Sequence, residues 1–88
     1  MKNDLDNKLI LKAFSIIRER GEQVEKGHFF EGVTAYTDFD GYTLYFETKN
    51  VLMSFGFHNT YHLDYHSERD KKDFLQKMRN IVHEQNTN

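Results

Sequence analysis

Residues 33–47, VTAYTDFDGYTLYFE, contain two runs of alternating polar and apolar residues, one on each side of Asp40-Gly41. An Asp-Gly pair between two such runs is typical of a two-residue β-hairpin turn, because both positions must accept a positive φ. The register that follows pairs Phe39 with Tyr42, Thr37 with Leu44 and Ala35 with Phe46. The stretch therefore predicts an antiparallel hairpin with one apolar face.

Two further turns extend this hairpin. Lys49-Asn50 predicts another two-residue turn, and residues 58–60 predict a three-residue loop. The predicted pairs are Phe46–Met53, Leu44–Phe55, Tyr42–Phe57, Phe57–Tyr61, Phe55–Leu63 and Met53–Tyr65. Because all three turns put apolar residues on the same face, we expect a four-stranded antiparallel meander over about residues 28–66.

The beginning of this sheet is left open by the sequence. Strict alternation would place Glu31 on the apolar face, and a bulge near Gly32 would avoid this. Residues 22–26 could alternatively form a short additional strand before Lys26-Gly27.

Helices are predicted at both ends of the chain, over residues 4–20 and 68–84, because apolar residues recur there at spacings of three and four. Gly21 is expected to end the first helix in a left-handed conformation, and Ser67 to cap the second. We therefore predict one α+β domain over residues 1–88, in the order α-β-β-β-β-α, with both helices packed on one sheet face. Its expected core contains Phe14, Ile17, Leu44, Phe46, Phe55, Leu63, Phe74 and Met78.

Composition and charge exclude several classes of protein. The 88 residues contain no Cys, which excludes disulfides, thiolate metal sites and a Cys nucleophile. There is no apolar run near the ~20 residues of a membrane span and no signal peptide, so we expect a cytoplasmic protein. Residues 22–66 carry two lysines against seven carboxylates, a net charge of −5, together with eleven of the thirteen aromatics. An aromatic surface of this charge argues against a nucleic-acid partner.

The sheet face opposite the helices is the candidate functional surface. The predicted register arranges it in three rows: Asp38, Thr43, Gly56 and His62; then Tyr36, Tyr45, Ser54 and Asp64; then Thr34, Glu47, Leu52 and His66. An ordinary solvated face is the alternative interpretation. Exposed tyrosines are typical of binding surfaces. The candidate partner-binding residues are Tyr36, Tyr45, Glu47, His62, Asp64 and His66.

Metal binding and catalysis receive little support from the same residues. Alternate strand residues lie ~6.6 Å apart, so Asp64 could share a metal with His62 or with His66, but no complete ligand set is present. Ser54 with one of these histidines could be imagined as nucleophile and base, yet a flat face offers no oxyanion donors. Residues 38–41 resemble the opening of a calcium loop without its later ligands. We expect no metal, no cofactor and no catalytic residue.

Residues 31–42, EGVTAYTDFDGY, together with residues 57–65, FHNTYHLDY, resemble a small uncharacterised domain family of gammaproteobacteria. The resemblance covers nearly the whole chain. It implies a bacterial cytoplasmic protein and supplies no catalytic residue.

The leading functional hypothesis is a non-enzymatic binding or regulatory module that acts through the aromatic, acidic sheet face. Its partner would be another protein or a second copy of the chain. One alternative is a small-molecule or metal-binding protein, and a second is a small enzyme of unknown reaction. An acidic inhibitor that mimics nucleic acid is a variant of the leading hypothesis, suggested by the central charge of −5.

Overall fold

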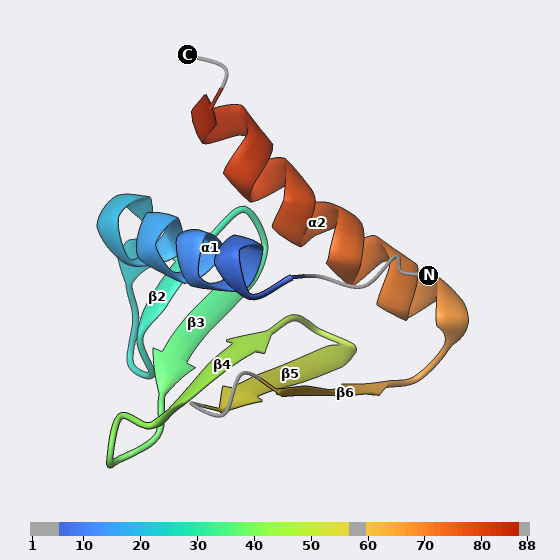
Figure 1. Ribbon diagram of the computed structural model, residues 1–88, viewed down its shortest axis with the longest axis horizontal. Coiled ribbons are helices and arrows are strands. Elements are labelled where there is room, and N and C mark those ends of the chain that lie inside the picture. The colour runs from blue at the N-terminus through green and yellow to red at the C-terminus, as the bar shows by residue number, and fades with distance from the viewer. Residues whose placement is uncertain (1–5, 57–59, 87–88) are drawn as a thin grey trace.

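The computed structural model describes residues 6–56 and 60–86, which form two helices and one antiparallel sheet (Figure 1). The elements in chain order are α1 (Asn7–Arg20), β1 (Glu22–Gln23), β2 (His28–Phe30), β3 (Val33–Thr37), β4 (Thr43–Glu47), β5 (Val51–Gly56), β6 (Tyr61–Tyr65) and α2 (Glu68–Asn86). Each strand pairs with the next one along the chain, in the order β1-β2-β3-β4-β5-β6. The predicted α+β class is confirmed, whereas the sheet has six strands rather than the predicted four.

Short polar side chains fix where both helices begin. Asp6 has an extended backbone, and its Oδ1 accepts a hydrogen bond of 2.8 Å from the Leu9 N–H, so α1 begins at Asn7 rather than at residue 4. The Asp70 N–H donates to Ser67 Oγ at 3.1 Å, which confirms Ser67 as the cap of α2. The second helix then continues to Asn86, two residues beyond the predicted end.

Gly21 leaves α1 with φ −78° and ψ 166°, so the predicted left-handed conformation is wrong. Its N–H donates to the Ile17 carbonyl oxygen at 2.8 Å. A Cβ atom at this position would lie 2.5 Å from that oxygen and 2.7 Å from the Phe29 carbonyl oxygen. Glycine is therefore needed here because the end of the helix approaches β2 closely, and not because of its φ.

One of the two additional strands comes from a turn that the sequence did not reveal. Glu31 and Gly32 have φ values of 52° and 85°, and Phe30 pairs with Val33 across them. Two positive φ values in succession define a tight hairpin turn, so there is no bulge at Gly32. The turn leaves Glu31 exposed, which removes the conflict in the alternation. The suggested extra strand within residues 22–26 is present as β1.

The hairpin of β3 and β4 has the predicted register but a longer turn. Ala35 pairs with Phe46 and Thr37 with Leu44, as predicted. The Asp38 N–H then donates to the Thr43 carbonyl oxygen at 3.1 Å, so the loop spans residues 39–42 rather than residues 40 and 41. Consequently Phe39 and Tyr42 do not form the predicted pair on the apolar face, and both are exposed.

The register of β5 with β6 differs from the prediction by two residues. Phe55 pairs with Tyr61 and Met53 with Leu63, and the Gly56 N–H donates to the Thr60 carbonyl oxygen at 3.0 Å, so the chain leaves β5 one residue earlier than predicted. A shift of two leaves every side chain on its predicted face, because strand side chains alternate. The predicted pairs of β4 with β5, Leu44–Phe55 and Phe46–Met53, are confirmed. The predicted pairs with Phe57 lie outside the described residues.

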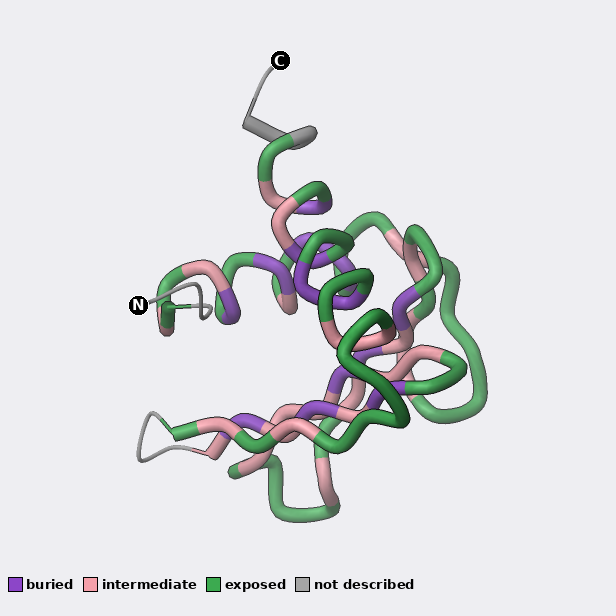
Figure 2. Tube along the Cα trace, turned by 90° about the vertical axis from the view of Figure 1, so that its right-hand side faces the viewer, coloured by how far each residue is buried: buried purple, intermediate pink, exposed green. Residues whose placement is uncertain are grey.

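The core lies between the helices and one face of the sheet (Figure 2). Helix α1 contacts β2 and β3, α2 contacts β5 and β6, and the helices contact each other. Five of the predicted core residues are buried, namely Ile17, Phe46, Phe55, Phe74 and Met78. The other three, Phe14, Leu44 and Leu63, are partly buried against this core. Among the described residues, neither helix is long and apolar enough to cross a membrane.

Candidate functional site

The candidate site is the sheet face that points away from both helices, and we call it the open face. Along β5 the alternation is complete: Val51, Met53 and Phe55 are buried under the helices, whereas Leu52 and Ser54 between them are partly exposed. The strand register assigns the following side chains to the open face: Phe29, Thr34, Tyr36, Thr43, Tyr45, Glu47, Leu52, Ser54, His62 and Asp64.

Two stacked tyrosine rings lie at the centre of the open face. Tyr36 and Tyr45 are direct partners across β3 and β4, as the sequence predicts. Their ring centroids are 5.1 Å apart and their planes are inclined by 15°. Aromatic pairs in this position stabilise a sheet and also present a rigid apolar surface with two hydroxyl groups at its edge.

The side chain of Lys26, from the turn between β1 and β2, lies over the ring of Tyr36 in this pair. Lys26 Nζ lies 2.7 Å from Glu47 Oε1 and 5.0 Å from the centroid of the Tyr36 ring. The Tyr36 hydroxyl donates to the same Glu47 oxygen at 3.3 Å. Gly27 permits this approach, because a Cβ atom there would lie 2.8 Å from Tyr36 Cβ. The charge of Glu47 is therefore balanced within the chain, which leaves Glu47 less able to attract a basic partner than the sequence suggests.

These contacts shift three pKa values, all of them away from neutrality. The hydrogen bond with Glu47 raises the pKa of Lys26 above 10.5, and the hydrogen bond from Lys26 lowers the pKa of Glu47 below 4.5. Partial burial, reinforced by the Glu47 carboxylate, raises the pKa of Tyr36 above 10.0. At neutral pH the site is a fixed ion pair beside a neutral phenol, and none of these groups is poised for proton transfer.

The ion pair predicts a defined pH dependence for Glu47→Gln. Because the folded pKa of Glu47 is lowered, its stabilisation is complete above 4.5 and is lost as the pH falls through the lowered value. Because the pKa of Lys26 is raised, its contribution is complete below 10.5 and is lost as the pH rises through the raised value. The urea midpoints of wild type and variant should therefore differ by a constant amount between about pH 6 and pH 9. This difference should be small and sensitive to salt, because the pair is exposed.

At acid pH the same two proteins should converge. Once Glu47 is protonated the wild type has no charge to pair, so its urea midpoint at about pH 2 should equal that of the variant. An undiminished difference at acid pH would show that the Lys26–Glu47 contact contributes nothing as an ion pair.

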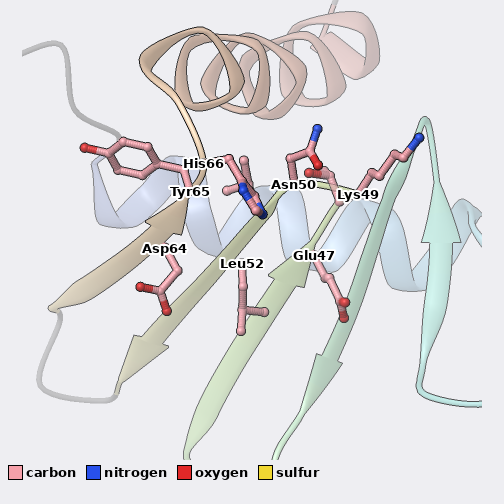
Figure 3. Close-up of a pocket in the computed structure, with 9 residues that line it drawn as sticks. Glu47, Lys49, Asn50, Leu52, Asp64, Tyr65 and His66 are labelled. Carbon is pink, nitrogen blue, oxygen red and sulfur yellow. The ribbon is translucent and has the colours of Figure 1, made fainter.

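Two hollows meet where β4 turns into β5. The larger has a volume of about 410 Å³ and is lined by Val24, Glu25, Lys26, Phe29, Gly32, Thr34, Glu47, Thr48 and Lys49. The other, of about 300 Å³, is lined by residues 47–52 and 64–66. In Figure 3, Glu47, Leu52 and Asp64 point to the side of the sheet away from α2, and Tyr65 and His66 lie nearer the helix. The larger hollow has the more apolar wall, because Val24 and Phe29 form part of it.

The remaining predicted site residues lie along β6 and beyond its end. His62 Nε2 is 3.5 Å from Asp64 Oδ1, and both side chains are largely exposed. The corrected register places His62 in the row of Tyr36 and Tyr45, and Asp64 in the row of Glu47, one row away from the predicted positions. His66 follows β6 and lines the smaller hollow.

The structure also bears on the predicted histidine cluster. Within residues 6–56 and 60–86, no group of three or more His, Asp or Glu side chains is placed to hold a metal ion. His58, the third histidine of the predicted cluster, lies outside the described residues.

Sequence reasoning missed Phe29 on the open face and also Val24 and Lys26, which line the same hollow. Their positions depend on two turns: Glu31-Gly32 pairs β2 with β3, and Lys26-Gly27 pairs β1 with β2. Reading Glu31-Gly32 as a hairpin turn would have placed Phe29 opposite Thr34, because the two positions flank it symmetrically. The pair Lys26-Gly27 was the sequence signal for the turn between β1 and β2. In the structure the Val24 N–H closes this turn by donating to the Gly27 carbonyl oxygen at 2.8 Å.

Comparison with known families matches residues 5–88 to a family described as a protein of unknown function, DUF3081. The match covers nearly the whole chain, and the chain belongs to this family. No curated protein matches the chain. No solved structure matches it either.

Proposed function

We propose that this member of the DUF3081 family is a non-enzymatic binding module that holds a segment of a protein partner on its open face. The observation that supports this most strongly is the apolar surface that no helix covers. Phe29 is 44% exposed and Val24 is 37% exposed, and both line the hollow of about 410 Å³ beside the tyrosine pair. Exposed rings beside an apolar hollow are typical of the anchor positions of protein interfaces.

The shape of the surface favours a polypeptide as the partner. A large apolar side chain of the partner would occupy the hollow between Val24 and Phe29, and the adjacent backbone would lie over the Tyr36–Tyr45 stack. The stacked rings lose little conformational entropy on binding, because each is already held by its neighbour and by the sheet.

The charge of the surroundings favours a basic segment. Glu25 lines the larger hollow and Asp64 the smaller one, and residues 22–66 carry a net charge of −5. Glu47 is already paired with Lys26, whereas Glu25 and Asp64 are exposed carboxylates that would attract a partner's lysines or arginines, although Asp64 also contacts His62. Exposed charges of this kind raise the rate of association more than the affinity, and salt weakens their effect.

A binding role without catalysis agrees with the electrostatics of the site. The pKa shifts of Lys26, Tyr36 and Glu47 hold each group in its usual protonation state at neutral pH. Catalytic acids and bases are instead tuned toward the working pH.

A site-specific photo-cross-link tests the proposed location. We expect benzoylphenylalanine at position 29, activated in an extract of the native host, to form a covalent product with another protein. The same probe in place of Lys72, an exposed residue of α2, should give no such product. Mass spectrometry of the cross-linked peptides identifies the partner and its attachment point. Equal products from both positions, or attachment from position 29 only to a second copy of this chain, would contradict the proposal.

A further inference from the structure

The end of the sheet farthest from the open-face hollows carries a fully exposed phenylalanine, Phe39. Those hollows lie where β4 ends, whereas the turn before β4 presents Phe39 (Figure 1). The relative exposure of Phe39 is 103%, so its side chain makes essentially no packing contact with the residues that the structure describes. A phenylalanine that is this exposed gains nothing for the fold from its apolar surface.

The turn holds Phe39 in a defined position. Asp38 Oδ1 accepts hydrogen bonds from the N–H groups of Gly41 at 2.8 Å and Tyr42 at 3.1 Å. The Gly41 N–H also lies 3.1 Å from the Asp38 carbonyl oxygen, and Gly41 has φ 81°, which suits glycine. The ring is therefore presented by a hydrogen-bonded turn, so little further ordering of the turn is required for an interaction.

An apolar hollow lies beside this turn. Its volume is about 200 Å³, and it is lined by Leu11, Gly41, Tyr42, Leu44, Phe55 and Gly56. Phe39 does not contribute to the lining, and Leu11 at its rim is 51% exposed. A cavity of about 150 Å³ accommodates benzene, so this hollow has room for a phenyl ring. One end of the molecule thus carries both a protruding ring and a hollow of suitable size and polarity.

We propose that this end is a self-association surface, on which Phe39 of one copy enters the hollow of a second copy and receives the second copy's Phe39 in return. Because the ring and the hollow belong to the same end of the chain, one two-fold axis satisfies both insertions at once. Such a closed contact forms a dimer rather than an extended polymer.

The charges around the two features are complementary. Asp40 follows Phe39 in the turn, and its side chain is exposed. Lys8 lies three residues before Leu11 and therefore on the same side of the helix. Each insertion brings the carboxylate of one copy toward Lys8 of the other, and the two-fold axis repeats this contact. This complementarity favours a second copy over an unrelated apolar segment.

The proposal does not depend on the function proposed for the open face, since the two surfaces lie at opposite ends of β4. Self-association through Phe39 would leave Phe29, Tyr36 and Tyr45 available to another protein.

Sedimentation velocity of the purified chain over a range of concentrations tests the proposal. Wild type is expected to show a reversible monomer–dimer equilibrium, and Phe39→Ser to weaken it by at least about ten-fold. Phe29→Ser is the matched control, because it removes an exposed phenylalanine from the open face and should leave the dimer unchanged. Circular dichroism should show both variants folded, because neither ring is buried. A wild type that remains monomeric, or a Phe39→Ser variant that dimerises like wild type, would overturn the proposal.

A mixing experiment tests the reciprocal insertion itself. Leu11→Glu places a charge in the hollow and should abolish self-association, although it keeps Phe39 intact. In a mixture of Leu11→Glu and Phe39→Ser, the ring of the first variant can enter the unaltered hollow of the second. The mixture should therefore associate more strongly than either variant alone, with one insertion in place of two. A mixture that associates no better than its components would overturn the reciprocal arrangement.

Discussion

Replacing Phe46 by alanine is expected to lower the free energy of unfolding by about 3–5 kcal/mol, the usual range for removal of a buried aromatic ring. Phe46 is completely buried in β4, on the face that the helices cover. Its ring meets the edge of Phe14 from α1, with centroids 5.8 Å apart and planes inclined by 81°. The substitution would leave a cavity between α1 and the sheet and would remove this aromatic contact.

The matched control is Phe39→Ala, the same chemical change at a fully exposed position. Its effect should stay within about 0.5 kcal/mol, because surface substitutions of this kind remove no packing. Urea unfolding of the three proteins, monitored by circular dichroism, measures both effects. A chain of this length is stabilised by roughly 4–13 kcal/mol in total, so the loss at position 46 is a large fraction of it. Similar midpoints for the two variants would show that Phe46 does not belong to the core.

The faces of the sheet could be predicted because the alternation of side chains along a strand does not depend on the exact turn length or on a register shift of two residues. The turn before β4 is longer by one residue at each end than predicted, and β6 is shifted by two residues against β5. The longer turn leaves the register of β3 with β4 unchanged, and a shift of two residues leaves every side chain of β6 on its predicted face. Tyr36 and Tyr45 were therefore placed together correctly, whereas His62 and Asp64 were assigned to the wrong rows.

Features that depend on backbone conformation or on distant contacts could not be predicted in the same way. Glutamate rarely adopts a positive φ, so Glu31-Gly32 suggested a bulge within one strand and not the turn that separates β2 from β3. The contact between Lys26 and Glu47 joins residues 21 apart and exists only once β1 and β2 extend the sheet. The exposure of Phe39 follows from the hydrogen bonds that Asp38 makes within its turn, whereas sequence alternation placed Phe39 on the apolar face.

We propose that the open face binds a partner and contributes little to folding. Replacing Tyr36 and Tyr45 together by serine removes the stacked rings at its centre. Stability should fall by only about 1 kcal/mol, the scale of a lost cross-strand pair. Partner binding should be lost, because the rings supply the rigid contact area against which the partner packs. The double variant Leu11→Ser/Phe39→Ser serves as the control, since it alters the opposite end of β4 and should retain the partner.

The decisive measurement is a quantitative capture from an extract of the native host, in which wild type, the tyrosine double variant and the control are immobilised at equal density. A urea melt of each protein accompanies the capture. We expect a protein that wild type and the control retain and that the folded Tyr36→Ser/Tyr45→Ser variant does not. A folded double variant that retains the same proteins as wild type would contradict this role of the open face. So would a double variant that fails to fold, because its tyrosines would then belong to the core.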